Sequence, residues 1–132
     1  MAVAFDSSSS VSAAGAGPHT VSHTCSGSDR LLVACVAFYH SGSFVTALTY
    51  AGAALTRLGN FSDFQYNSEI WYLVNPASGA NTLSLEFSGI QFGMGLMGLS
   101  FTGVDQTAPM AGYVSGSGTS TTPSVVASSG TD

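Results

Sequence analysis

The sequence predicts an all-β protein, an antiparallel β-sandwich of jelly-roll-like form with about ten short strands. Three observations lead to this prediction. Apolar residues show no helical periodicity, and short apolar or alternating runs occur throughout the chain. Gly, Ser, Asn, Asp and Pro separate these runs as turn residues do. Hydrophobic residues make up 45% of the sequence and charged residues 7%, a composition that favours a folded chain over a disordered one.

The expected strands follow the apolar runs in order. They are Ala2–Asp6, His19–Cys25, Arg30–His40, Val45–Tyr50, Ala53–Leu58, Ser68–Val74, Asn81–Phe87, Met94–Thr102, Gly112–Gly116 and Ser124–Ala127. Arg30–His40 is apolar on both faces and Ser68–Val74 behaves similarly, which suits central strands covered on each side. Asn81–Phe87 alternates apolar and polar residues, so we expect one of its faces to meet solvent.

The length of 132 residues predicts a single domain, residues 1–132. Residues 7–17, SSSSVSAAGAG, combine small side chains with high backbone freedom. We expect this segment to be a Ser/Gly/Ala loop or arm, either ordered across one end of the sandwich or flexible.

Charge excludes two classes of partner. The sequence has no lysine, its basic residues are Arg30 and Arg57, and its net charge is -5. A nucleic-acid surface needs clustered cations and a polybasic membrane anchor needs the same, so we expect neither nucleic acid nor membrane as a partner. Lysine also guards exposed strand edges against pairing, and this chain lacks that defence.

The N-terminal residues MAVAFDSSSS lack the basic region and apolar stretch of a signal peptide, and no run reaches the length of a membrane span. We therefore expect a soluble protein made in a cytoplasm and not exported by the ordinary route. Cys25 and Cys35 are expected to be free and mostly buried thiols, because a hairpin would place them several rungs apart.

His19 and His23 are four residues apart, which on a strand separates them by about 13 Å, so they cannot share one metal ion unaided. We expect them to be polar surface histidines and predict no metal site. Gly93–Gly98, GMGLMG, matches a dinucleotide-binding fingerprint in letters only, because no strand–turn–helix unit surrounds it. Its small residues instead indicate a strand lying close to its neighbours. With no nucleophile motif and scattered carboxylates, we expect a non-enzyme without catalytic residues or cofactor.

The segment Gly59–Ser68, GNFSDFQYNS, reads as a loop that carries Phe61, Phe64 and Tyr66 among polar residues. Loop aromatics can stack on sugar rings or fill a partner's pocket, so these three are the candidate contacts to a partner or a glycan. The other interpretation has two of them folding back to cap the sandwich. Gly103 and Asp105 are predicted to form a structural turn, with Asp105 bonding to nearby amides.

Four stretches resemble a family of β-sandwich domains found in phage virion and tail proteins and in large bacterial surface or secreted proteins. They are HTVSHTCSGSDRLLVACVAF, VTALTYAGAALTRLG, SEIWYLVNPASGANTLSLEFSG and FTGVDQTAP. The resemblance covers almost the whole chain and implies the sandwich fold, but it carries no catalytic residues. Cys25 and Cys35 stand where the family usually has Val or Gly.

Family members usually continue past TPSVVASSGTD with a further apolar strand. Either the given chain is part of a longer product, or the sandwich leaves an edge for a neighbour to fill. Ser124, Val125, Val126 and Ala127 are therefore the candidate residues for edge-strand pairing.

The expected function is that of a non-enzymatic virion structural protein, a decoration or cement protein on a phage capsid. Its expected partners are copies of itself and a major capsid or tail protein, and its expected location is the virion. The first alternative is a carbohydrate-binding or adhesion module of a tail fibre or surface filament, located at an extracellular surface. The second is a fibre subunit joined by strand exchange.

Overall fold

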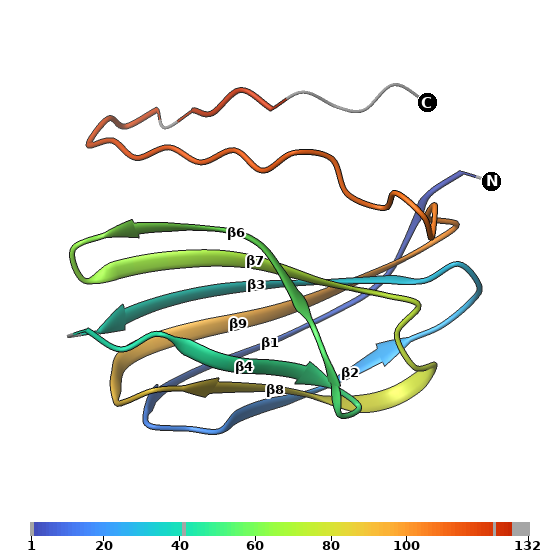
Figure 1. The fold of residues 1–132 in the computed structure, drawn as a ribbon, viewed down its shortest axis with the longest axis horizontal. Helices are drawn as coiled ribbons and strands as arrows, with labels where there is room; N and C mark the ends of the chain where they lie inside the picture. The colour runs from blue at the N-terminus through green and yellow to red at the C-terminus, as the bar shows by residue number, and fades with distance from the viewer. Residues whose placement is uncertain (1, 41, 123, 128–132) are drawn as a thin grey trace.

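The computed structural model describes residues 2–40, 42–122 and 124–127, and over these ranges the chain forms two antiparallel sheets packed face to face (Figure 1). One sheet has the strand order β1-β9-β3-β7-β6 and the other β2-β8-β4-β5. The strands are β1 (Ala4–Gly15), β2 (His19–Cys25), β3 (Leu31–His40), β4 (Val45–Tyr50), β5 (Ala53–Ala54), β6 (Thr56–Asp63), β7 (Tyr66–Val74), β8 (Gly79–Phe87) and β9 (Gln91–Thr102). The predicted antiparallel β-sandwich is confirmed.

Successive strands cross between the sheets, from β1 to β2 to β3 to β4, and again from β7 to β8 to β9. This alternation is typical of a jelly roll, and β6 adds an extra edge strand beside β7. The predicted strand Ala53–Leu58 is divided at Leu55: β5 stays in the four-stranded sheet and β6 joins the five-stranded one. Among the described residues there is no helix that could cross a membrane.

The core lies between the two sheets. Leu32, Val36 and Phe38 of β3 meet Leu83 and Leu85 of β8, and all five side chains are buried. Each contributes about 1.5–3 kcal/mol by leaving water. The central position predicted for Arg30–His40 is confirmed, because β3 pairs with β7 on one side and β9 on the other.

Gly98 on β9 shows why this strand carries small residues. A Cβ placed there would lie 3.1 Å from Leu83 Cδ2 and 3.2 Å from His23 Nδ1. The GMGLMG stretch is thus part of a strand that lies close against the opposite sheet, as predicted.

The predicted loop over residues 7–17 is wrong for most of its length, because residues up to Gly15 belong to β1 and pair along β9. The inward side chains of this strand include Ser7 and Ser9, which give no apolar signal in the sequence. Backbone pairing and a polar network around His23, described below, stabilise the first half of the strand, and Val11 and Ala13 pack against the core in its second half.

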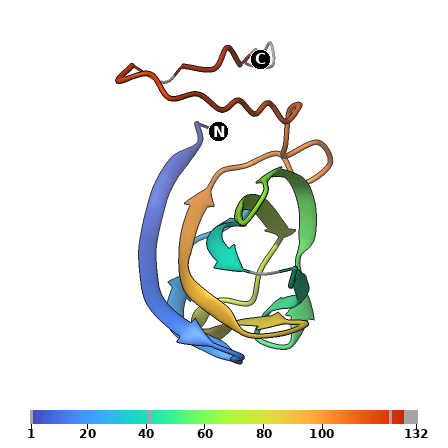
Figure 2. The ribbon, with the colours of Figure 1, turned by 90° about the vertical axis from the view of Figure 1, so that its left-hand side faces the viewer.

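After β9 the chain forms a segment without strands over residues 103–122 and 124–127, which we call the C-terminal strap. It runs along the outside of the sandwich on the side of β6 and β7 (Figures 1 and 2). The predicted strands Gly112–Gly116 and Ser124–Ala127 are therefore wrong. A strand needs a ladder partner, and the strap crosses the outer face of the five-stranded sheet, where the backbone groups are already paired.

Candidate binding surface

Three aromatic rings form a row at the end of the sandwich farthest from the N-terminus. Tyr39 of β3 lies between Tyr66 of β7 and Phe92 of β9, with ring centroids 5.0 Å and 5.4 Å apart. Register explains the row, because Tyr39 pairs directly with Tyr66 and with Gly93, the residue next to Phe92. Tyr66 is 67% exposed and Phe92 57% exposed, so the row presents aromatic surface to solvent.

Phe64 stands at the tip of the hairpin that joins β6 to β7. Asp63 pairs with Tyr66, which leaves Phe64 and Gln65 as a two-residue turn. Phe64 has a φ of 51° and is 97% exposed. Left-handed backbone costs roughly 1–2 kcal/mol for a residue other than Gly or Asn, and the exposed ring gains nothing from burial. A bulky apolar residue here is unfavourable for folding, and such strain is a recognised mark of functional sites.

Phe61 lies on β6, half-buried, on the outer face of the sheet. Together with Tyr39, Tyr66 and Gly93 it lines a shallow hollow of about 400 Å³. We call the surface formed by Tyr39, Phe61, Phe64, Tyr66 and Phe92 the aromatic end face. The three residues singled out in the sequence thus share one end of the molecule, with Phe64 at its tip.

The predicted loop at Gly59–Ser68 is wrong, because all but its two turn residues belong to β6 and β7. Strand pairing holds the aromatic side chains more rigidly than a loop would. The sequence did not predict Tyr39 and Phe92 as part of this surface, because they lie far apart in the chain and only the pairing of β3 with β9 brings them together. Their place directly beside turn residues, in FYHSGS and SGIQF, was the one available signal.

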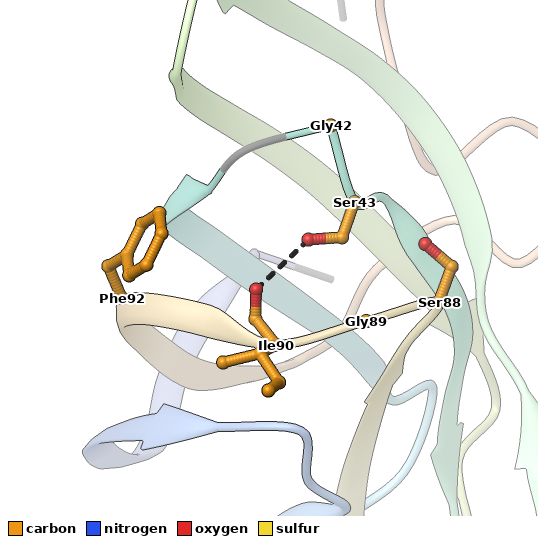
Figure 3. Close-up of a pocket in the computed structure, with 6 residues that line it drawn as sticks. All are labelled: Gly42, Ser43, Ser88, Gly89, Ile90 and Phe92. Atoms are coloured by element: carbon orange, nitrogen blue, oxygen red, sulfur yellow. Dashed lines mark hydrogen bonds between the residues drawn. The ribbon is translucent and has the colours of Figure 1, made fainter.

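A second hollow, of about 450 Å³, lies beside Phe92 and is lined in part by Ser43 and Ser88 (Figure 3). Ser43 Oγ donates to the Ile90 carbonyl at 3.2 Å and accepts from Gln91 Nε2 at 2.7 Å. Ser88 Oγ accepts from a backbone N–H at 3.0 Å. Each hydroxyl therefore keeps hydrogen-bonding capacity for a ligand.

The five residues that define the aromatic end face include no acid or base beyond the phenols of Tyr39 and Tyr66, but the exposed Asp63 pairs with Tyr66 across the hairpin and places a carboxylate at its edge. The ion pair of the described chain lies elsewhere: Glu69 Oε1 is 3.6 Å from Arg57 Nη1, and Glu69 Oε2 accepts from Trp71 Nε1 at 2.7 Å. The five aromatic side chains are consequently suited to the apolar part of a partner surface, with the Asp63 carboxylate at its rim.

A buried polar network joins β1 to β2 and β9. His23 is 1% exposed, and its Nδ1 lies 2.8 Å from Ser9 Oγ while its Nε2 lies 3.5 Å from Ser7 Oγ. Ser100 Oγ donates to Asp6 Oδ2 at 2.7 Å. The predicted surface position of His23, and likewise of His19, is wrong, since both side chains are buried between the sheets.

This network has the residue types of a catalytic triad, but they are connected in a different order. In a triad the imidazole lies between the nucleophile and a carboxylate. Here serines hold both ring nitrogens, and the Asp6 carboxylate instead accepts from the Ser26 N–H at 2.8 Å and from Ser100. The network serves to fasten β1 to the rest of the sandwich.

Burial lowers the pKa of His23, an effect that the nearby Asp6 carboxylate partly opposes. Burial raises the pKa of Asp6, but hydrogen bonds from Ser26 and Ser100, together with the nearby His23, outweigh it, and the net pKa is lowered. His23 is thus held neutral and Asp6 ionised, which preserves the hydrogen bonds of the network.

Gly103 has a φ of 67° and its N–H bonds to the Ser28 carbonyl at 3.2 Å, while Asp105 Oδ1 accepts from the Thr107 N–H at 2.8 Å, so the predicted turn is confirmed.

Cys25 is a free buried thiol and Cys35 a free half-buried one. Ser124–Ala127 forms no strand in the described chain. Within residues 2–40, 42–122 and 124–127, no three His, Cys, Asp or Glu side chains are grouped to hold a metal ion.

Comparison with known proteins finds no matching family model, no matching curated protein and no matching solved structure.

Proposed function

We propose that this protein is a non-enzymatic structural component of a virion, a decoration protein that binds a phage capsid and neighbouring copies through repeated protein contacts. The observation that carries the proposal is the aromatic end face, above all Phe64, whose ring is 97% exposed on a left-handed backbone. An exposed apolar ring and a left-handed backbone both disfavour folding, and contact with a partner would explain why Phe64 stands at this position. The sequence resemblance to virion sandwiches supports the same proposal.

The energetics of protein interfaces support an anchor of this kind. A few aromatic residues at the centre of an interface commonly provide most of the binding free energy. The row formed by Tyr39, Tyr66 and Phe92 is held by strand pairing, so little conformational entropy is lost when it binds.

The decisive experiment is the composition and structure of particles from cells that make this protein. We expect mass spectrometry and electron microscopy to find many ordered copies on the shell, with the aromatic end face at a contact. Recombinant Phe64→Asn protein should bind bare shells at least tenfold more weakly than the wild type. Phe44→Asn, which removes another exposed ring from the same end, should bind as the wild type does.

Particles that contain no copies, or shells that bind the Phe64→Asn variant normally, would overturn the proposal.

A neutral saccharide is the second candidate partner, and the hollow in Figure 3 favours it. The Phe92 ring lines the same hollow as the Ser43 and Ser88 hydroxyls, with Ser88 at the opposite end, and so combines an apolar face with hydrogen-bonding groups, as sugar-binding sites do. A glycan array distinguishes the candidates. Binding that disappears in both Phe92→Ala and Ser88→Ala, but persists in Phe64→Asn, would establish the adhesion function instead.

A further inference from the structure

An apolar groove lies between the outer face of the five-stranded sheet and the C-terminal strap. We call it the sheet groove, and its volume is about 670 Å³. Its floor includes Ala37, Gly95 and Met97, and its sides include Phe61 from β6 and Tyr113 from the strap. The floor is apolar because Ala37 and Met97 carry apolar side chains and Gly95 carries none.

The sheet groove offers no free charge. Among its described lining residues the one carboxylate is that of Glu69, which is bound by Trp71 and Arg57, and no Arg or His lines the groove. Glu69 pairs in register with the core residue Val36, so its side chain belongs to the opposite face of the sheet. An occupant of the groove must therefore be apolar and uncharged.

We propose that the sheet groove of one copy receives the Phe64 hairpin tip of a second copy, an inference that rests on the proposed function. The tip consists of Phe64 and Gln65, both uncharged, and the Phe64 ring is almost wholly exposed in its own molecule. The exposed Asp63 flanks the tip and would remain at the rim of the groove, in contact with water. A dry apolar cavity of about 150 Å³ holds a benzene ring. The larger groove accepts a phenyl ring together with the backbone of the turn.

The contact is head-to-tail, because the tip and the sheet groove are different surfaces of the molecule. A pair joined by such a contact still has one free groove and one free tip. Further copies can therefore add until a ring closes, or without limit if the geometry does not close. A chain that decorates a shell by repeated contacts has use for such propagation.

The area of the contact sets its strength. A phenylalanine buries about 150–250 Å². Even with its neighbours, the tip remains below the roughly 1,200–2,000 Å² of a stable interface. The single contact is accordingly weak and depends on concentration, and it becomes effective where many copies are held side by side. Each copy carries a net charge of -5, so added salt should strengthen association by screening the repulsion.

The test is sedimentation of the isolated protein at rising concentration up to millimolar, in low and moderate salt. We expect the average mass of the wild type to rise beyond that of a pair, and to rise more in salt. Phe64→Asn removes the tip. Gly95→Leu fills the groove, and its side chain has open space, since a Cβ at Gly95 meets nothing within 4 Å. Both variants should remain monomeric, with circular dichroism spectra of the folded protein.

A mixture of the two variants provides the sharpest measurement. Phe64→Asn keeps an intact groove and Gly95→Leu keeps an intact tip, so the mixture should form pairs and nothing larger. Gly118→Leu adds the same side chain on the strap, at a position with equal space and away from the sheet groove. It should associate as the wild type does. Ala37→Leu fills the groove from β3 and repeats the test should Gly95→Leu not fold.

A wild type that stays monomeric at millimolar concentration overturns the docking proposal, and so does a mixture of folded variants that forms no pairs. Association that survives Phe64→Asn overturns it as well. Shell binding by a protein that does not associate with itself would leave the proposed function standing while this inference fails. A monomer that binds no shell would contradict both.

Discussion

The ring of Tyr113 lies directly against the backbone of Gly59. A Cβ added at Gly59 would lie closer to Cγ and Cδ1 of that ring than nonbonded atoms allow. This contact connects the C-terminal strap to β6, the edge strand of the five-stranded sheet, and it sets the height of one side of the sheet groove. A residue with any side chain at position 59 would therefore separate the strap from the sheet.

Gly59→Ala should lift the strap and leave the sandwich folded. Forcing one methyl group into a packed contact costs about 1–3 kcal/mol, here concentrated on a segment without strand pairing. We expect faster hydrogen exchange and proteolysis within residues 105–122, with unchanged protection of β3 and β9. Tyr113→Ala should reproduce this loosening by removing the other partner. Equal protection of the strap in wild type and Gly59→Ala would contradict the prediction.

Phe64→Asn should raise the stability of the fold while it weakens binding to the proposed partner. Asparagine tolerates a positive φ, so the change relieves about 1 kcal/mol of backbone strain and should raise the melting temperature by a few degrees. Thermal denaturation followed by circular dichroism measures the effect. Phe64→Ala serves as the control, because it removes the ring and keeps the strain, and its melting temperature should not rise.

A melting temperature for Phe64→Asn at or below that of the wild type would show that the turn is not strained. The opposite signs expected for stability and binding separate an anchor for a partner from a residue that supports the fold.

The sequence predicted the sandwich because the signals of its central strands are local. The period of two in Asn81–Phe87 and the apolar run Arg30–His40 depend only on neighbouring residues. Only the beginning of β1 was predicted, as part of Ala2–Asp6. The rest was missed because Ser7 and Ser9 face inward, where they contact His23, a residue from another strand. No local pattern records such a contact.

The strap shows the reverse error. Ser124–Ala127 has the composition of a strand, but a strand also requires a free neighbouring edge, which local composition does not reveal. The sequence predicted only part of the candidate site, because local composition does not reveal which strands pair. Phe61, Phe64 and Tyr66 are close in sequence, whereas Tyr39 and Phe92 join them only through the register of β3 with β7 and β9.

Gly95→Leu and Gly98→Leu should have opposite consequences, although the change is the same and the positions are three residues apart on β9. The Cβ at Gly95 enters open space, so leucine there should leave stability unchanged or slightly raised through better strand propensity. At Gly98 it meets Leu83 and His23 at 3.1–3.2 Å, so leucine should cost about 1–3 kcal/mol or more. Chemical denaturation measures both, and equal losses would contradict the assigned faces of the strand.

Acid should weaken the attachment of β1 through His23. Its pKa is lowered in the folded state, chiefly by burial, so below its unfolded pKa of about 6.5 the unfolded chain binds a proton that the folded chain does not. The folded state then binds fewer protons, and stability falls as the pH falls through that value. Asp6 adds a further loss at lower pH, because its folded pKa is also lowered and its contribution disappears as the carboxylate is protonated.

His23→Gln isolates the histidine step. Glutamine keeps an amide that can bond to Ser9 but does not titrate, so the fall in melting temperature between about pH 8 and pH 5 should become smaller than in the wild type. The wild type should lose hydrogen-exchange protection first along β1, where Ser7 and Ser9 depend on a neutral imidazole. The same pH dependence in both proteins would show that His23 does not control it. Early loss at β2 instead of β1 would place the weakness on the other side of the network.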